Sequence, residues 1–168
     1  MNPDLFWIPG PWAGRLAVMT RPRGGDWLTD EVAGWKRAGI DLVVSLLEND
    51  EANQLELADE EAAARSRGIG FTSFPIADRG VPASLSDAVE LLRGIASALR
   101  EGRNVAVHCR QGVGRSGMIA SGVFVVSGAE PRKAIEAVSA ARGQNVPETP
   151  VQLRWIQNLP TEHLVGAR

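Results

Sequence analysis

The chain has 168 residues, enough for one domain whose core buries about 70% of the surface of the unfolded chain, and we expect a single domain over residues 1–168. It is 44% hydrophobic and 23% charged, and its net charge of −2 gives no general attraction to nucleic acid or to an anionic membrane surface. Its one cysteine excludes an internal disulfide framework and a cysteine-rich zinc site.

The start of the chain lacks the basic region and apolar stretch of a signal sequence. No apolar run reaches the ~18 residues that span a bilayer. Together with the single cysteine, these features predict a cytoplasmic protein, and we expect a monomer that contacts neither nucleic acid nor a membrane.

Short apolar runs alternate with segments of helical periodicity along the chain. In chain order, the predicted elements are strands at 6–8 and 16–19, a helix at 29–39, a strand at 40–47, a helix at 50–67, a strand at 71–76, a helix at 84–102, a strand at 104–107, and helices at 117–126, 131–142 and 150–159. Because strands that alternate with helices form parallel sheets, we expect an α/β fold with a central, mainly parallel sheet and helices on both of its faces.

Polar residues mark several of the predicted helix ends. Thr29 is expected to cap the first helix, and Ser84 with Asp87 resembles a capping box at the start of another. The segment 50–67 has acidic residues early and arginines late, as the helix dipole favours, and we interpret its charges as a solvated face. The segment 117–126 has almost no charge and is predicted to be the central, buried helix.

The run from His108 to Gly117, between the last predicted strand and the buried helix, carries most of the chemistry. A strand that leads through a glycine-rich turn into a helix directs backbone N–H groups and the positive helix end at one point, which attracts an anion. Arg115 can hold two phosphoryl oxygens with its planar fork. We expect a phosphoryl group to be bound by Cys109, Arg110, Gln111, Gly112, Val113, Gly114 and Arg115.

Cys109 is the predicted nucleophile of this loop. The groups that stabilise a bound dianion also stabilise a thiolate and lower a thiol pKa that starts near ~8.5. The hydroxyl of Ser116 is placed to donate to the sulfur and to ease its departure from an intermediate. We interpret His108 as a hydrogen-bonding support for the loop, because a thiolate needs no base.

Displacement of an alkoxide or phenoxide from phosphorus needs a proton donor on the leaving-group side. Asp78 follows the predicted strand 71–76, and the carboxyl ends of parallel strands lie on one rim of a sheet, so Asp78 and Cys109 should lie on the same rim. We therefore expect Asp78 to be the general acid. A turn residue or a partner of Arg79 is the alternative, and Asp87 is the second candidate acid, although capping accounts for it.

The run from His108 to Gly117 resembles the signature loop of the cysteine-dependent protein tyrosine phosphatases, and the segment around Asp78 is similar to their acid loop. Over roughly residues 42–156, the chain resembles the small dual-specificity phosphatases of the kinase-associated and Cdc14-like branch. The resemblance implies a protein tyrosine phosphatase-like fold and hydrolysis of phosphotyrosine without a metal or other cofactor. Since the chain has no tyrosine for a recognition loop, we expect a shallower pocket that also accepts phosphoserine and phosphothreonine.

The resemblance also implies a mechanism in two steps. Cys109 attacks phosphorus while Asp78 protonates the leaving oxygen, and Asp78 then acts as the base for the water that hydrolyses the phosphocysteine. Gln152 matches the residue of a late loop that helps to position this water.

Functions of two other classes use a comparable loop. An arsenate reductase or a sulfurtransferase requires neither an acid before the loop nor Gln152 after it. A non-catalytic phosphate-binding module would be expected to have lost Cys109, Asp78 or Arg115, and all three are present. The sequence therefore favours a phosphatase whose partner is a phosphorylated protein or peptide.

Overall fold

The computed structural model describes residues 4–160, and the strands within this range form one five-stranded sheet. The strands are β1 (Leu5–Ile8), β2 (Leu16–Met19), β3 (Leu42–Ser45), β4 (Gly70–Ser73) and β5 (Val105–His108). In the sheet order β1-β2-β5-β3-β4, β1 is antiparallel to β2 and the other neighbours are parallel. The predicted α/β fold with a mainly parallel sheet is confirmed. Residues 1–3 and 161–168 of the predicted domain lie outside the described residues.

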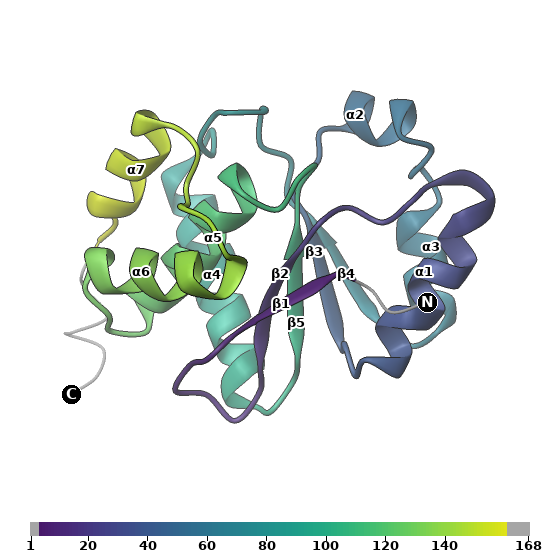
Figure 1. The fold of residues 1–168 in the computed structure, drawn as a ribbon, viewed down its shortest axis with the longest axis horizontal. Coiled ribbons are helices and arrows are strands. Elements are labelled where there is room, and N and C mark those ends of the chain that lie inside the picture. Colours follow the sequence, from purple (N-terminus) through teal and green to yellow (C-terminus); the bar gives the residue numbers. More distant parts are fainter. Residues whose placement is uncertain (1–3, 161–168) are drawn as a thin grey trace.

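Helices cover both faces of the sheet (Figure 1). On one face, a 3-10 turn η1 (Gly25–Trp27) leads into α1 (Leu28–Arg37), and α3 (Glu60–Ser66) lies beside it, while α2 (Asn49–Gln54) lies at the carboxyl end of the strands. The other face is covered by α4 (Leu85–Arg100), α5 (Gly114–Val126), α6 (Pro131–Arg142) and α7 (Pro150–Gln157). None of the helices within residues 4–160 combines the length and the apolar composition needed to cross a bilayer.

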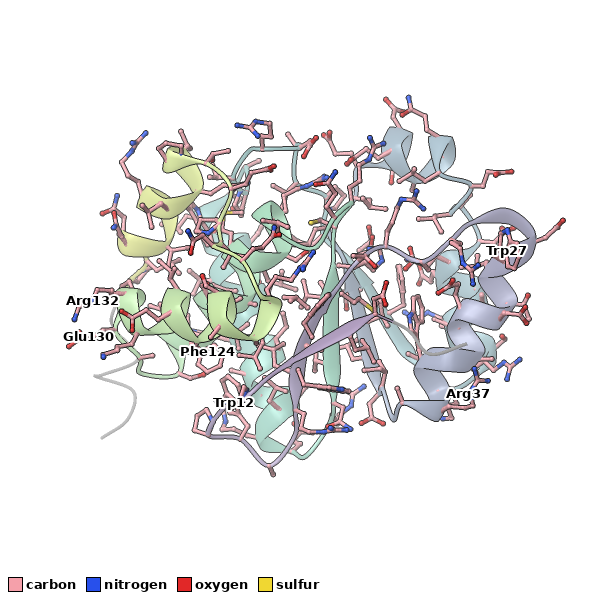
Figure 2. The ribbon with its side chains drawn as sticks, in the orientation of Figure 1. Trp12, Trp27, Arg37, Phe124, Glu130 and Arg132 are labelled. Atoms are coloured by element: carbon pink, nitrogen blue, oxygen red, sulfur yellow. The ribbon has the colours of Figure 1, made fainter. Side chains whose placement is uncertain are left out.

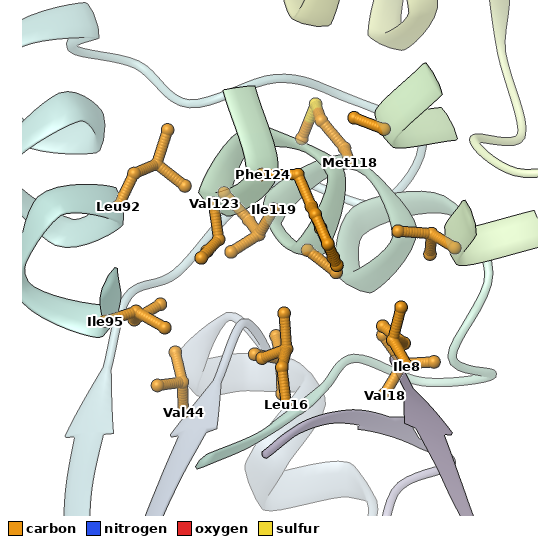
Figure 3. Close-up of a cluster of buried hydrophobic side chains, with 14 of the residues drawn as sticks. Ile8, Leu16, Val18, Val44, Leu92, Ile95, Met118, Ile119, Val123 and Phe124 are labelled. Atoms are coloured by element: carbon orange, nitrogen blue, oxygen red, sulfur yellow. The ribbon is translucent and has the colours of Figure 1, made fainter. Parts of the chain in front are cut away.

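The central strands β2, β3 and β5 are largely buried because their residues alternate between two cores. On β2, Leu16 and Val18 belong to the core beneath α4–α7, and Ala17 and Met19 belong to the core beneath α1 and α3. Figure 3 shows the first core, in which sheet residues pack against Leu92, Ile95, Met118, Ile119, Val123 and Phe124. As predicted, α5 is the central helix and is buried along nearly its whole length.

The helix predicted at residues 50–67 is wrong, because this segment forms two short helices, α2 and α3. Between them Glu56 has a φ of +58°, which a non-glycine residue seldom adopts. The backbone carbonyl of Glu56 accepts a hydrogen bond from the N–H of Gly25 at 3.0 Å, and the side chain of Leu57 is buried in the core beneath α1. These contacts with distant residues break the helix.

Two predicted helix starts also differ from the structure. Thr29 is not an N-cap, because the 3-10 turn carries the chain into α1 at Leu28. The helix predicted from residue 117 begins at Gly114, so Arg115 and Ser116 lie in its first turn. At α4, the hydroxyl of Ser84 accepts the N–H of Asp87, as the capping pattern predicts.

The strands β3 and β4 end before the predicted residues 47 and 76, because the chain leaves the ladder at the rim that carries the site.

Several of the tryptophans pack in or against the cores, and one is exposed. Trp35 is buried in the core beneath α1, and Trp12 packs against Phe124 with ring centroids 4.8 Å apart (Figure 2). Trp27 is 53% exposed, on the other side of the sheet from Trp12 in the view of Figure 2.

Candidate active site

The loop after β5 closes around a small cavity of about 80 Å³ at the carboxyl rim of the sheet. Gly112 in this loop has a φ of +76°, and a Cβ there would lie 2.9 Å from the carbonyl oxygen of Met19, so the turn requires glycine. Arg142 of α6 donates to the carbonyls of Gly112 and Gln111 and braces the loop from outside. The cavity is lined by Asp78, Arg79, Cys109, Arg110, Gln111, Val113, Gly114, Arg115 and Glu148.

The thiol of Cys109 lies in the wall of this cavity and is 3% exposed. The hydroxyl of Ser116 donates to Sγ at 2.8 Å. Burial by itself would raise the pKa of the thiol, but hydrogen bonds from Ser116 and from the N–H of Gly112, together with the charge of Arg115, lower the pKa of Cys109 below its ordinary value. The site therefore favours a thiolate.

Arg115 presents a guanidinium that is held in a fixed orientation. Its Nη1 and Nη2 donate to Oε1 and Oε2 of Glu51 at 2.6 and 2.9 Å, and Nη1 also donates to the carbonyl of Ile76 at 2.9 Å. Burial would lower the pKa of Arg115, but Glu51 raises it, and the hydrogen bond from Arg115 in turn lowers the pKa of Glu51. Both groups are therefore charged at neutral pH.

His108 is fully buried at the end of β5, where its ring has a partner on each nitrogen. Nε2 lies 2.5 Å from Oε2 of Glu60, and Nδ1 lies 3.1 Å from the carbonyl oxygen of Cys109. Burial alone would lower the pKa of His108, but the carboxylate of Glu60 and the carbonyl of Cys109 raise it above the ordinary value. The ring occupies the position expected of a support for the loop.

The sequence interpretation of the acidic segment 50–67 as a solvated face is wrong at two positions. The side chains of Glu51 and Glu60 are 14% and 4% exposed, and they hold Arg115 and His108. Because α2 and α3 are separate helices, each can direct one carboxylate inward. Glu61, the next residue, is 54% exposed and pairs with Arg65, and this spacing of four residues is the local signal that separates it from Glu60.

Asp78 lies between β4 and α4, with its side chain 59% exposed and Oδ1 3.4 Å from Nη2 of Arg115. It is not the partner of Arg79, whose Nη1 lies 3.4 Å from Oε2 of Glu148. Asp87 lies in the first turn of α4 and does not line the cavity. The fold thus brings Asp78 to the rim that carries Cys109.

Gln152 is buried in the first turn of α7, where it forms a capping box with Thr149. Its Nε2 donates to the carbonyl of Gly80 at 3.0 Å, and its Oε1 accepts from the backbone N–H groups of Glu148 and Thr149. The side chain does not line the cavity, but it joins the segment that carries Asp78 to the loop before α7.

The cavity has no aromatic wall among the residues that the structure describes. Within residues 4–160, no group of three or more His, Cys, Asp or Glu side chains is placed to hold a metal ion. The side chains that line the cavity include one thiol, the guanidinium groups of Arg79, Arg110 and Arg115, and the carboxylates of Asp78 and Glu148.

The sequence model of the family described as "Polymorphic toxin system, DSP-PTPase phosphatase" matches residues 17–129. The chain belongs to this family of dual-specificity phosphatase domains, which confirms the resemblance expected from the sequence.

Individual relatives agree with this assignment. The crystal structure of Tk-PTP in its active form is 32% identical, covers 95% of this chain and 97% of that chain, and has a TM-score of 0.75. Kinase associated phosphatase, with its catalytic-site cysteine replaced by serine, has a TM-score of 0.87 at 18% identity and covers 100% of this chain and 98% of that chain. A protein of Invertebrate iridescent virus 6 that is named as a tyrosine phosphatase is 25% identical over 158 residues, 92% of this chain and 56% of that protein. The chain spans a little over half the length of the curated relatives that it matches.

Proposed function

We propose that this protein hydrolyses phosphate esters of phosphorylated proteins or peptides through a phosphocysteine intermediate. The observation that carries the proposal is the pairing of a buried, easily ionised Cys109 with the oriented guanidinium of Arg115 in the wall of one small cavity. In this proposal, residues 1–168 act as one catalytic domain. The proposed reaction needs no metal or other cofactor.

Arg115 binds the phosphoryl group with the side of its guanidinium. Glu51 accepts one hydrogen from each Nη atom, and Ile76 accepts the second hydrogen of Nη1. Nε–H and the second hydrogen of Nη2 form a fork of the width that two phosphoryl oxygens need. Oδ1 of Asp78 lies 3.4 Å from this Nη2, so Asp78 borders the position of the phosphoryl group. The N–H groups of the loop residues 110–115 bind the remaining charge.

In the first step, Sγ of Cys109 attacks phosphorus and an S–P bond forms as the P–O bond to the leaving group breaks. Asp78, at the mouth of the cavity, gives its proton to the leaving oxygen. In the second step Asp78 takes a proton from water, which attacks phosphorus, and the sulfur leaves as a thiolate that Ser116 stabilises through its 2.8 Å hydrogen bond.

Gln152 acts in the second step through the two segments that it joins. Its side-chain amide binds the backbone of Gly80, two residues after Asp78, and the backbone of Glu148, which lines the cavity. Gln152 thereby fixes the distance between the general base and the wall where the water must lie.

We further propose that the protein accepts phosphotyrosine as well as phosphoserine and phosphothreonine. No aromatic side chain among the described residues deepens the cavity, which supports a shallow site. The net charge of −2 and the neutral side chains of Gln111 and Val113 in the loop disfavour nucleic acid and lipid headgroups. The protein acts as a monomer in the cytoplasm in this proposal.

The test is hydrolysis of para-nitrophenyl phosphate and of a panel of phosphopeptides by the wild type and by Cys109→Ser. The variant should lose turnover but still bind vanadate, because the loop amides and Arg115 remain. Substantial turnover by Cys109→Ser would remove the assignment of the nucleophile. Arsenate reduction or sulfur transfer without ester hydrolysis would favour the other cysteine chemistries.

A further inference from the structure

A buried carboxylate contacts the residue before the nucleophile and does not line the cavity of the site. Glu60 of α3 is 3% exposed and His108 is fully buried, and the two side chains contact each other at 2.5 Å. The other ring nitrogen of His108 lies 3.1 Å from the carbonyl oxygen of Cys109. A continuous line of contacts therefore runs from α3 to the nucleophile, and no step of the proposed reaction uses Glu60.

The two partners of the His108 ring determine its protonation. Each ring nitrogen faces an oxygen, a carboxylate at Nε2 and a backbone carbonyl at Nδ1. A neutral imidazole has one N–H and would leave one nitrogen lone pair facing an acceptor. Both contacts are satisfied by an imidazolium that faces the Glu60 carboxylate, or by a neutral ring whose Nε2 accepts the O–H of a Glu60 carboxylic acid. The pKa of His108 is raised, which favours the imidazolium.

Among the groups around the His108 ring, Glu60 is the one that stabilises the imidazolium. The residues beside His108 on the neighbouring strands are Met19 and Ser45, which carry no charge. Glu60 and Cys109 are the charged groups that act on the ring, and Glu60 raises the pKa of His108 against the effect of burial. Without this carboxylate, only the smaller contributions of Cys109 would act against burial, which favours the neutral imidazole.

We propose that Glu60 is a positioning residue of the active site, which keeps His108 as an imidazolium whose Nδ1–H holds the Cys109 peptide and whose charge favours the Cys109 thiolate. The proposal rests on the proposed function in that it takes Cys109 as the nucleophile. The charge of Cys109 raises the pKa of His108, and by linkage the imidazolium must favour the thiolate by the same free energy.

The substitution Glu60→Gln separates charge from geometry. The amide N–H of glutamine can donate to Nε2 of a neutral His108, whose Nδ1–H still reaches the carbonyl of Cys109, so the contacts remain and the charge is lost. Glu61→Gln is the matched control, because Glu61 follows on the same helix but is 54% exposed.

The measurement is the rate of alkylation of Cys109 by iodoacetamide as a function of pH, and the chain has no other cysteine. In Glu60→Gln the midpoint should move to higher pH, and alkylation at a pH below both midpoints should slow by about tenfold for each pKa unit of the shift. Glu61→Gln should follow the wild-type profile. Coincident profiles for all three folded proteins would overturn the proposal.

A second measurement covers the case in which Glu60→Gln does not fold. The chain has two histidines, so the ring nitrogens of His108 can be assigned by ¹⁵N NMR of the wild type against a His163→Gln variant. Both nitrogens of His108 should carry hydrogen at pH values above 6.5, the ordinary pKa of histidine. A neutral tautomer at neutral pH would refute the proposal. Neither readout needs turnover, so a failure of the proposed hydrolysis is distinguishable from a failure of this inference.

Discussion

Replacement of Glu51 by alanine tests how the phosphate-binding guanidinium is held. The carboxylate accepts hydrogen bonds from Arg115 at 2.6 and 2.9 Å, and the two side chains are 14% and 1% exposed. Loss of one partner of a buried ion pair costs about 3–5 kcal/mol, because the other charge is left buried. Since Glu51 retains some contact with water, we expect a loss of about 3 kcal/mol in the free energy of unfolding for Glu51→Ala, the lower end of that range. For a domain of this size, Tm should fall by about 6–12 °C.

Urea unfolding followed by circular dichroism measures this loss. Glu51 also accepts the backbone N–H of Glu48, and the Glu48 side chain accepts the backbone N–H of Glu51 in the same capping box of α2. Glu48→Ala removes this second bond and is the control for the cost of one capping bond, about 1 kcal/mol. The pKa of Glu51 is lowered, chiefly by the hydrogen bond from Arg115. The contribution of Glu51 is therefore complete above its ordinary pKa of 4.5 and is lost as the pH falls through the lower pKa of the folded protein.

Two results would refute this reasoning. If Glu51→Ala lowers the free energy of unfolding no more than Glu48→Ala does, the Glu51–Arg115 ion pair contributes no more than an exposed ion pair, about 0–1 kcal/mol. If the difference between wild type and Glu51→Ala does not shrink as the pH falls below 4.5, the carboxylate charge is not its source.

Three further substitutions test the rest of the site. Asp78→Asn should lower kcat by about 10²–10⁴ for phenyl phosphate and much less for para-nitrophenyl phosphate, whose leaving group needs little protonation; equal losses would place the acid elsewhere. Ser116→Ala removes the 2.8 Å hydrogen bond that lowers the pKa of Cys109, so the acid limb of the kcat/KM profile should move to higher pH, and an unmoved limb contradicts this role. Gly117→Ala places a Cβ 2.6 Å from Cβ of Val146 and should cost about 1–3 kcal/mol in thermal unfolding; an unchanged Tm would mean that the segment around Val146 gives way.

Helix ends and tight turns that depend on a few neighbouring residues could be predicted from the sequence. The helix predicted at residues 131–142 has these bounds in the structure, with Pro131 at its first position and Gly143, at a φ of +83°, as its C-cap. The run from His108 to Gly117 contains the end of a strand, a tight turn and a helix start within ten consecutive residues. The meeting of the thiol of Cys109, the amides and Arg115 is therefore a property of local geometry.

The features of the fold and the site that were not predicted depend on contacts between distant segments. Charge alone does not show which acidic residues of the segment 50–67 turn inward, because Glu60 and Glu61 carry the same charge. The choice depends on the break at Glu56, which forms because Gly25 binds its backbone and Leu57 must be buried in the core beneath α1. In the same way, Gln152 binds the backbone of Gly80 across 72 positions of sequence. The alternating elements and the anion-binding loop are determined by local sequence, whereas the orientation of each supporting carboxylate depends on which neighbouring apolar residue enters the core.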